Sequence, residues 1–138
     1  MSVQSRYFSA LQLRSLERLG DCYLPGTDTL PAFSATGCIE QVDVVLEGVD
    51  EGDIQGLGLL LMVLRWMPLF AIRLLLALLD RHHRFPPPLA GLFRLLNLGL
   101  KGPVVTLYYS GLGAGGESSG VHEAMAFELH CEPDEVNA

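Results

Sequence analysis

The longest apolar run in the chain covers Leu57–Leu79 (LGLLLMVLRWMPLFAIRLLLALL). Pro68 lies inside this run and lacks the N–H that an unbroken helix would use. The run therefore predicts two helices, about Ile54–Trp66 and Pro68–Leu79, with the proline in the first turn of the second. Both are apolar on nearly all sides, which is typical of helices that are buried in a core or against a partner.

A run of this length also raises the question of a membrane span, because about 20 apolar residues can cross a bilayer. Arg65 and Arg73 lie within it, and each would cost about 2.5 to 3.5 kcal/mol near the bilayer centre. Together with Pro68 they argue against a spanning helix. Core or partner-facing helices are the preferred interpretation, and a segment that lies in or on a membrane is the alternative.

Before this run, the chain predicts a helix over Ala10–Tyr23. Ser9 followed three residues later by Gln12 fits a capping box, in which each side chain bonds a backbone N–H of the other. Leucines recur at helical spacing on the inner face: Leu13, Leu16 and Leu19. A Leu-Pro-Gly turn at 24–26 then ends the helix.

A second helix is predicted over about Gly37–Glu47, with Ser34 or Thr36 as its cap. Its inner stripe is apolar: Ile39, Val42 and Leu46. Its outer stripe is acidic: Glu40, Asp43 and Glu47. Asp43 and Glu47 are one turn apart, but exposed acids on helices often are, so the sequence favours solvated side chains over a catalytic carboxylate pair.

Beyond a cationic loop with three prolines, another helix is predicted over about Leu89–Leu100. Four leucines are expected to face inward: Leu92, Leu95, Leu96 and Leu100. Gly99 and Gly102 are expected to end the helix, and Pro103 to begin a separate short segment at 104–110. A short helix is preferred for this segment, although its β-branched residues would also allow a strand. Tyr108 and Tyr109 in that segment are interpreted as one core and one rim aromatic residue rather than as a stack for a cofactor.

Residues 111–138 are expected to form a glycine-rich linker and an acidic tail outside a helical domain at 1–110. The Gly-Leu-Gly-Ala-Gly-Gly pattern at 111–116 resembles a nucleotide-binding fingerprint, but that fingerprint needs a strand before it and a helix after it. A flexible hinge is therefore preferred. Met125, Phe127 and Leu129 alternate, which would suit one edge strand or a docking segment in a loosely held tail.

Taken together, these patterns predict an all-α protein, a compact bundle of about five or six helices with a flexible acidic C-terminal tail. The formal net charge of -7 argues against a nucleic-acid partner, since phosphate binding needs a cationic face. The charges are unevenly distributed, because residues 57–101 hold six cations and one acid, whereas no Lys or Arg follows Gly111. If Arg65 and Arg73 are buried, acidic partners are expected among Asp43, Glu47, Asp80 and the tail.

No catalytic, cofactor-binding or metal-binding residue is predicted. His82 and His83 are adjacent and point in different directions, so their spacing does not suit a metal pair. The tail contains residues of metal-ligating type at spacings that match no recurring site: His122, Glu123, His130, Cys131 and Glu132. Cys22, Cys38 and Cys131 are odd in number and widely spaced, which favours buried free thiols, although a bridge between the first two is an alternative.

Excess apolar surface on a small protein usually marks an interface, and aromatic residues are enriched at its energetic centre. Trp66 is the preferred anchor for a partner, and an internal core role is the alternative. The residues predicted to bind a partner are Met62, Arg65, Trp66, Met67, Phe70, Arg73, Tyr108 and Tyr109.

The order of several motifs resembles the gluconate 2-dehydrogenase subunit 3 family, the small gamma-type subunits that accompany flavin-dependent GMC oxidoreductases. The likeness covers roughly residues 9–112. It includes the Tyr-Leu-Pro-Gly turn at 23–26, the segment Ser-Ala-Thr-Gly-Cys-Ile-Glu-Gln-Val-Asp at 34–43, the apolar helices, and a Phe-Arg helix that leads to Leu-Tyr-Tyr-Ser at 107–110.

This resemblance implies a non-catalytic accessory subunit that binds a large flavoprotein and helps it mature. FAD would then belong to the partner, and no cofactor to this chain. Many such subunits escort their partner on a twin-arginine signal, but MSVQSRYFSA at the N-terminus lacks one, and the family's Gly-Tyr element after the Tyr-Tyr segment is also missing. We therefore expect a cytoplasmic location, with a periplasmic or membrane-peripheral one as the alternative if the chain is co-transported.

Two other functions remain open at the level of sequence. One is a membrane-associated helical protein in which residues 57–100 lie in a bilayer. The other is a helical bundle that encloses an apolar small molecule between its central helices.

Overall fold

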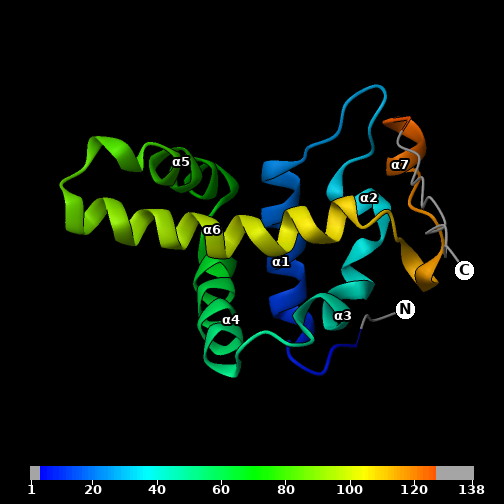
Figure 1. Ribbon diagram of the computed structural model, residues 1–138, viewed down its shortest axis with the longest axis horizontal. Helices are drawn as coiled ribbons and strands as arrows, with labels where there is room; N and C mark the ends of the chain where they lie inside the picture. The colour runs from blue at the N-terminus through cyan, green and yellow to red at the C-terminus, as the bar shows by residue number, and fades with distance from the viewer. Residues whose placement is uncertain (1–3, 127–138) are drawn as a thin grey trace, which may run out of the picture.

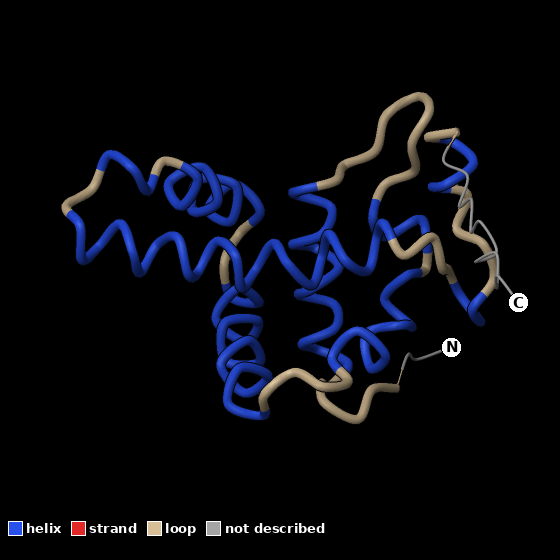
Figure 2. The backbone as a smooth tube through the Cα atoms, viewed as in Figure 1, coloured by secondary structure: helices blue, strands red, loops and turns tan. Residues whose placement is uncertain are grey.

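The computed structural model describes residues 4–126 of the 138-residue chain. Every regular element in this range is a helix, so the prediction of an all-α fold is confirmed. The long helices, shown in Figures 1 and 2, are α1 (Ala10–Tyr23), α4 (Glu51–Trp66), α5 (Leu69–Asp80) and α6 (Pro87–Tyr109). The short elements are α2 (Phe33–Thr36), η1 (Cys38–Gln41), α3 (Val42–Leu46), η2 (His82–Arg84), η3 (Ala114–Gly116) and α7 (Val121–Ala124).

Helix α1 has the predicted bounds and the predicted capping box. The backbone N–H of Ser9 donates to Gln12 Oε1 at 2.8 Å, and the N–H of Gln12 donates to Ser9 Oγ at 3.4 Å. These bonds satisfy N–H groups that have no partner within the helix. The three predicted inner leucines are all buried, and this face forms the centre of the core.

The predicted helix over 37–47 is wrong as one element, because Gly37 interrupts it with a left-handed φ of 69°. Helix α2 ends there, and η1 and α3 follow. Thr36 does not cap a helix N-terminus. Its hydroxyl donates to the carbonyl of Phe33 at 2.7 Å and accepts from the N–H of Cys38 at 3.2 Å, which ties the two sides of the turn together. The inner stripe is still correct, since Ile39, Val42 and Leu46 are buried.

The long apolar run forms two helices, as predicted, although α4 begins three residues earlier than expected. Asp50 is its N-cap and accepts from the N–H of Gly52 at 2.9 Å, which places a carboxylate at the positive end of the helix dipole. Pro68 is the N-cap of α5, a position that does not require a backbone N–H.

The predicted end of the next helix at Leu100 is wrong. Helix α6 continues through Gly99, Gly102 and Pro103 as far as Tyr109. Beyond the proline, the side chains of Val104, Leu107 and Tyr108 are buried. This burial outweighs the hydrogen bond that Pro103 cannot make to the preceding turn.

Two of the leucines expected to face inward from α6 do not. Leu92 and Leu95 are exposed, Leu96 is half-buried and Leu100 is buried. Leu92 and Leu95 lie on the same face of α6 as Gly102 and Thr106, which are also exposed, whereas Leu100 lies on the face that is buried in the core. Figure 1 shows α6 crossing the molecule, with its C-terminal half over α1. The N-terminal half projects beyond α1 with α5 packed beside it. We call α5, η2 and this half of α6 the arm.

Residues 111–120, which were predicted to form a linker, are hydrogen-bonded to one another and to η1. The N–H of Gly113 donates to the carbonyl of Glu117 at 2.7 Å, and the N–H of Gly115 donates to Glu40 Oε2 at 2.8 Å. A β-carbon on Gly113 would lie 2.5 Å from the carbonyl oxygen of Thr36, so this close approach needs a glycine. Phe127, Leu129, His130, Cys131 and Glu132 lie outside the described residues.

Candidate partner-binding surface

The most exposed large apolar side chains lie around the turn that joins α4 to α5. Trp66 is 79% exposed at the end of α4, and Phe70 is 74% exposed in the first turn of α5. On α4 the exposed residues recur every three or four positions, which places them on one face. We call this set the tip surface: Leu59, Met62, Val63 and Trp66 of α4, and Leu69, Phe70 and Leu74 of α5.

The structure brings six of the predicted partner-binding residues together at the tip, with Met67 half-buried in the turn. The other two, Tyr108 and Tyr109, lie at the far end of α6. Tyr108 is buried and its hydroxyl donates to the carbonyl of Pro31 at 2.7 Å, so this side chain is part of the core. Tyr109 is exposed, and its ring packs edge-on against the Tyr108 ring, with the two ring centres 5.1 Å apart. The expected division into one core and one rim aromatic is observed.

Arg65 and Arg73 are both exposed, so the acidic partners proposed for buried arginines are not needed. The guanidinium carbon of Arg65 lies 5.2 Å from the centre of the Trp66 ring, within the range of a cation–π contact. The tip therefore presents an aromatic ring with a cation over it. This combination suits an interface, because Trp and Arg are the residue types that dominate binding energy at protein surfaces.

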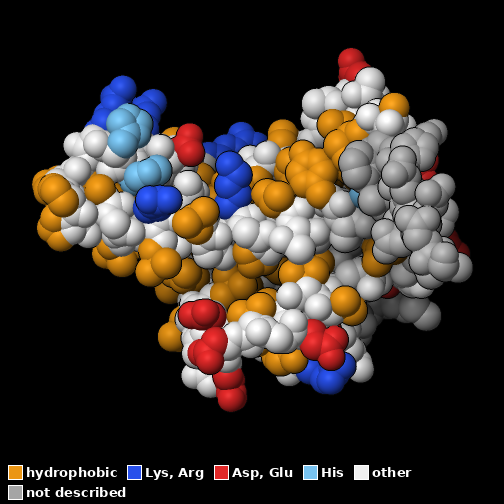
Figure 3. Space-filling view, in the orientation of Figure 1, with side chains coloured by type: hydrophobic (Ala, Val, Ile, Leu, Met, Phe, Trp, Pro, Cys, Tyr) orange, Lys and Arg blue, Asp and Glu red, His pale blue; other side chains and the backbone are white. Residues whose placement is uncertain are grey.

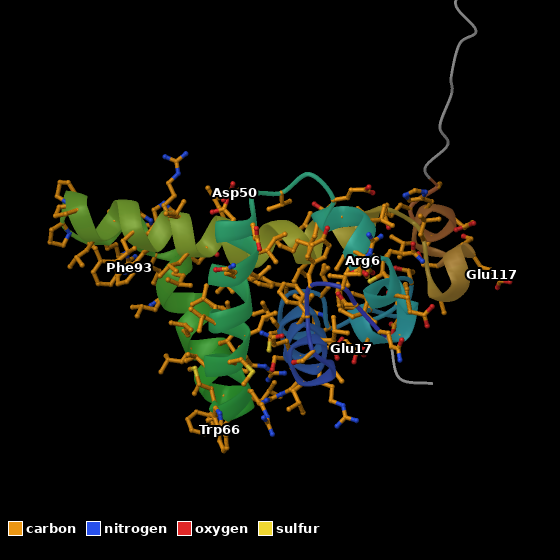
Figure 4. All side chains as sticks on the ribbon, turned by 90° about the horizontal axis from the view of Figure 1, so that it is seen from below. Arg6, Glu17, Asp50, Trp66, Phe93 and Glu117 are labelled. Carbon is orange, nitrogen blue, oxygen red and sulfur yellow. The ribbon has the colours of Figure 1, made fainter. Side chains whose placement is uncertain are left out.

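A side chain of α1 is hydrogen-bonded to the turn that joins α4 to α5. Arg18 donates to the carbonyl oxygen of Met67 at 3.0 Å and to that of Arg65 at 3.3 Å. These carbonyls end α4 and have no partner within the helix, so the cation satisfies them at the negative end of the dipole. Leu61 and Leu64, on the opposite face of α4, are buried. Figure 4 shows Trp66 at the end of α4 that points away from α6.

A second surface feature is a groove of about 630 Å³ between the N-terminal half of α4 and the middle of α6. Most of its lining is apolar, with Asp53 and Thr106 as the polar side chains. Gly56 on α4 and Gly99 on α6 line it, and a β-carbon on either would meet no atom within 4 Å. The groove is therefore broad and its walls are low at these two positions.

Charge is separated across this face of the molecule. Figure 3 shows Lys, Arg and His side chains at the end of the arm, Asp and Glu side chains at the N-terminal end of α4, and hydrophobic side chains between them. The region around the N-terminal end of α4 is acidic because the chain has no Lys or Arg between residues 19 and 64. The two regions are complementary in sign.

Among the described residues, the titratable groups with shifted pKa values lie outside the tip surface. Burial, followed by the charge of Asp80 and then Cys22, raises the pKa of Tyr23 to about 12. Burial is also the main cause that raises the pKa of the Cys38 thiol and of the Glu17 carboxyl. Cys22 and Cys38 are free thiols, as the sequence favoured.

Two of the acids identified in the sequence, Asp43 and Glu123, accept hydrogen bonds. Asp43 accepts hydrogen bonds from the Ser5 hydroxyl and from the backbone N–H of Arg6, the latter at 2.9 Å, and so holds the N-terminal segment to α3. Ser118 donates to Glu123 Oε1 at 2.7 Å, and this bond is the main cause that lowers the Glu123 pKa. Of the two acids that are one helical turn apart, Asp43 therefore anchors the N-terminal segment and Glu47 is exposed to solvent.

Within residues 4–126, no group of three or more His, Cys, Asp or Glu side chains is placed to hold a metal ion. Over the same range, no helix combines the length and the apolar character needed to cross a membrane. His82 and His83 lie in η2, with ring centres 6.1 Å apart and planes nearly perpendicular, consistent with the divergent directions expected for neighbours.

Comparison with protein-family models, curated proteins and solved structures finds no match to this chain. The tip surface, the groove and the order of sequence motifs are therefore the features of this chain that bear on its function.

Sequence reasoning missed several residues of both surfaces. It did not identify Leu59, Val63 and Leu74 at the tip, because all-round apolar helices give no signal for which face is exposed. It also did not single out Gly56, and it interpreted Gly99 as a helix end. The regular spacing of exposed leucines and glycines along α6 was present in the sequence and could have indicated a second packing face.

Proposed function

We propose that this protein is a non-catalytic accessory subunit that binds a larger protein through the tip surface. The single observation that carries the proposal is the 79% exposure of Trp66 beside the equally prominent Phe70. Leaving two large aromatic side chains in water forgoes about 1.5 to 3 kcal/mol for each side chain that could be buried. A partner that covers them would recover this free energy.

The motif order supports a finer proposal for the partner, a flavin-dependent oxidoreductase of the GMC type. The anchor region lies within the part of the chain that resembles the gluconate 2-dehydrogenase subunit 3 family. In that arrangement the FAD and the reacting groups belong to the large subunit, and this chain contributes binding and maturation.

The test is affinity capture of the tagged full-length chain from its native cells, followed by an absorbance scan for oxidised flavin at about 450 nm. The expected result is a stoichiometric large partner with a flavin spectrum. A large colourless partner would keep the accessory role and exclude the flavoprotein. Recovery with the membrane fraction and without a protein partner would replace the proposal with a membrane-lying role for the apolar helices.

Trp66→Ala tests whether the tip is the binding surface. Truncation of a central anchor costs about 2 kcal/mol or more, which corresponds to an affinity about 30-fold weaker. Val44→Ala is the matched control, because Val44 is also apolar and highly exposed but lies on α3, outside the tip. Equal binding by the two variants would exclude the tip as the interface.

A further inference from the structure

Helix α6 carries an exposed stripe that the tip surface does not use. Its members are spaced alternately four and three residues apart, which is the a/d pattern by which two helices pack along a seam. All are exposed, and β-carbons built on its two glycines would meet nothing within 4 Å. We call this set the α6 seam: Pro88, Leu92, Leu95, Gly99, Gly102 and Thr106.

The α6 seam is complementary to itself when reversed. Leu95 and Gly99 lie two residues on either side of Asn97, and Leu92 and Gly102 lie five residues on either side. If a second copy of α6 packs antiparallel about Asn97, each leucine of one copy faces a glycine of the other. Large side chains opposite small ones allow two helices to interdigitate closely.

We propose that two copies of this chain form a two-fold symmetric dimer through antiparallel α6 seams. Leu95 is 68% exposed, so burying it in a partner removes much apolar surface from water. The two-fold arrangement is closed, since each copy uses the same surface and none is left to recruit a third. The proposal does not depend on the flavoprotein partner, because the tip surface lies on α4 and α5.

The groove beside the seam can receive side chains of the second helix. It is bordered by α6 on one side and by the N-terminal half of α4 on the other, and Gly52 and Gly56 form part of the α4 side. Helices pack with axes about 8 to 10 Å apart, and glycines allow the closer end of that range. The seam members Leu95, Gly99 and Thr106 also line the groove, so a helix on the seam covers it.

The charges on either side of the groove favour a second copy of this chain as the partner that covers it. The chain at the groove's α4 edge is acidic and exposed, with Asp50, Glu51 and Asp53 in sequence order. Asp53 lines the groove together with Leu98, Gly99 and Pro103 of α6. Antiparallel pairing about Asn97 brings the middle of the second α6, with its exposed Arg94 and Lys101, to the same level. The acidic edge of each copy thus faces cations of the other.

The first test is the mass of the wild-type chain in solution by light scattering. The monomer is 15.0 kDa, so the proposal expects twice that mass, with dissociation favoured by high salt. A monomer at the highest soluble concentration overturns the proposal. So does a monomer that purifies with an apolar small molecule in the groove.

The second test exchanges the two members of one seam pair. Gly99→Leu places leucine opposite leucine and Leu95→Gly places glycine opposite glycine, so each single variant should weaken the dimer at least tenfold. The double variant restores one large and one small side chain at every such contact and should recover most of the affinity. Circular dichroism confirms that the monomers remain helical.

Leu78→Gly is the matched control for the exchange. Leu78 is also an exposed leucine, but it lies on α5, outside both the seam and the tip surface. A dimer that is lost in this control, or a double variant no better than the singles, would place the contact elsewhere and overturn the antiparallel register.

Discussion

The guanidinium of Arg18 donates a hydrogen bond to the carbonyl oxygen of Met67 across 3.0 Å. This contact joins the first helix of the chain to the turn that presents Trp66, about fifty residues later in the sequence. It connects the stability of the core with the geometry of the tip, because the same side chain also bonds the last turn of α4.

Replacing this donor should loosen the tip without unfolding the protein. Arg18→Met keeps an unbranched apolar stem but leaves two helix-terminal carbonyls without their charged donor, at an expected cost of about 1 to 3 kcal/mol. Urea unfolding measures the loss, and hydrogen exchange should increase most near residues 66–68. Arg14→Met, on an exposed position of the same helix, is the control and should change stability by less than about 0.5 kcal/mol.

The close packing of α1 against Phe33 predicts that Gly20 cannot be enlarged. A β-carbon on Gly20 would lie 2.2 Å from Phe33 Cδ1, in a part of the core where both residues are buried. Gly20→Ala should therefore lower the free energy of unfolding by about 1 to 3 kcal/mol, because the ring must move out of a filled site. Gly91→Ala, on an open face of α6, should instead raise it by about 0.5 to 1 kcal/mol. Similar changes in both variants would contradict the contact.

The hydroxyl of Tyr108 should contribute to stability through the carbonyl of Pro31. Tyr108→Phe removes the donor at 2.7 Å and leaves that carbonyl unpaired, for an expected loss of about 1 kcal/mol in chemical denaturation. Tyr109→Phe modifies the neighbouring exposed ring and should have little effect. A neutral Tyr108→Phe would show that water replaces the bond.

The raised pKa of Tyr23 predicts a loss of stability at alkaline pH. The pKa of the phenol is about 10 in the unfolded chain and about 12 in the folded protein. Between these values the folded state holds a proton that the unfolded state releases, so this contribution is complete below pH of about 10 and declines as the pH rises toward 12.

Comparing wild-type and Tyr23→Phe stability across that pH range isolates this contribution. The variant should show a shallower decline, although it also loses the bond from Tyr23 to Asn97 Oδ1 at 3.3 Å. Asp80→Asn should bring the phenol pKa closer to its ordinary value, because the Asp80 charge is one cause of the shift. Parallel curves for wild type and Tyr23→Phe would mean that the phenol does not control alkaline stability.

The sequence by itself determined the helical class, the bounds of α1 and the division of the long apolar run at Pro68. These features depend on interactions between residues close along the chain: a capping box, leucines at helical spacing, and a missing N–H. It also placed six of the residues predicted to bind a partner between Met62 and Arg73, on either side of the turn that joins α4 to α5.

Only the tertiary structure decided which apolar residues are covered. Leu89 and Leu100 are eleven residues, about three turns, apart and lie on the same face of α6, yet Leu89 is exposed and Leu100 is buried, because α1 lies beneath only one half of α6. Because side chains beyond Pro103 are buried, α6 also continues through two glycines and a proline, although these residues have low helix propensity. Local propensities are small compared with the free energy of burying several large side chains, so the positions of distant helices determine where the core ends and where the binding surfaces begin.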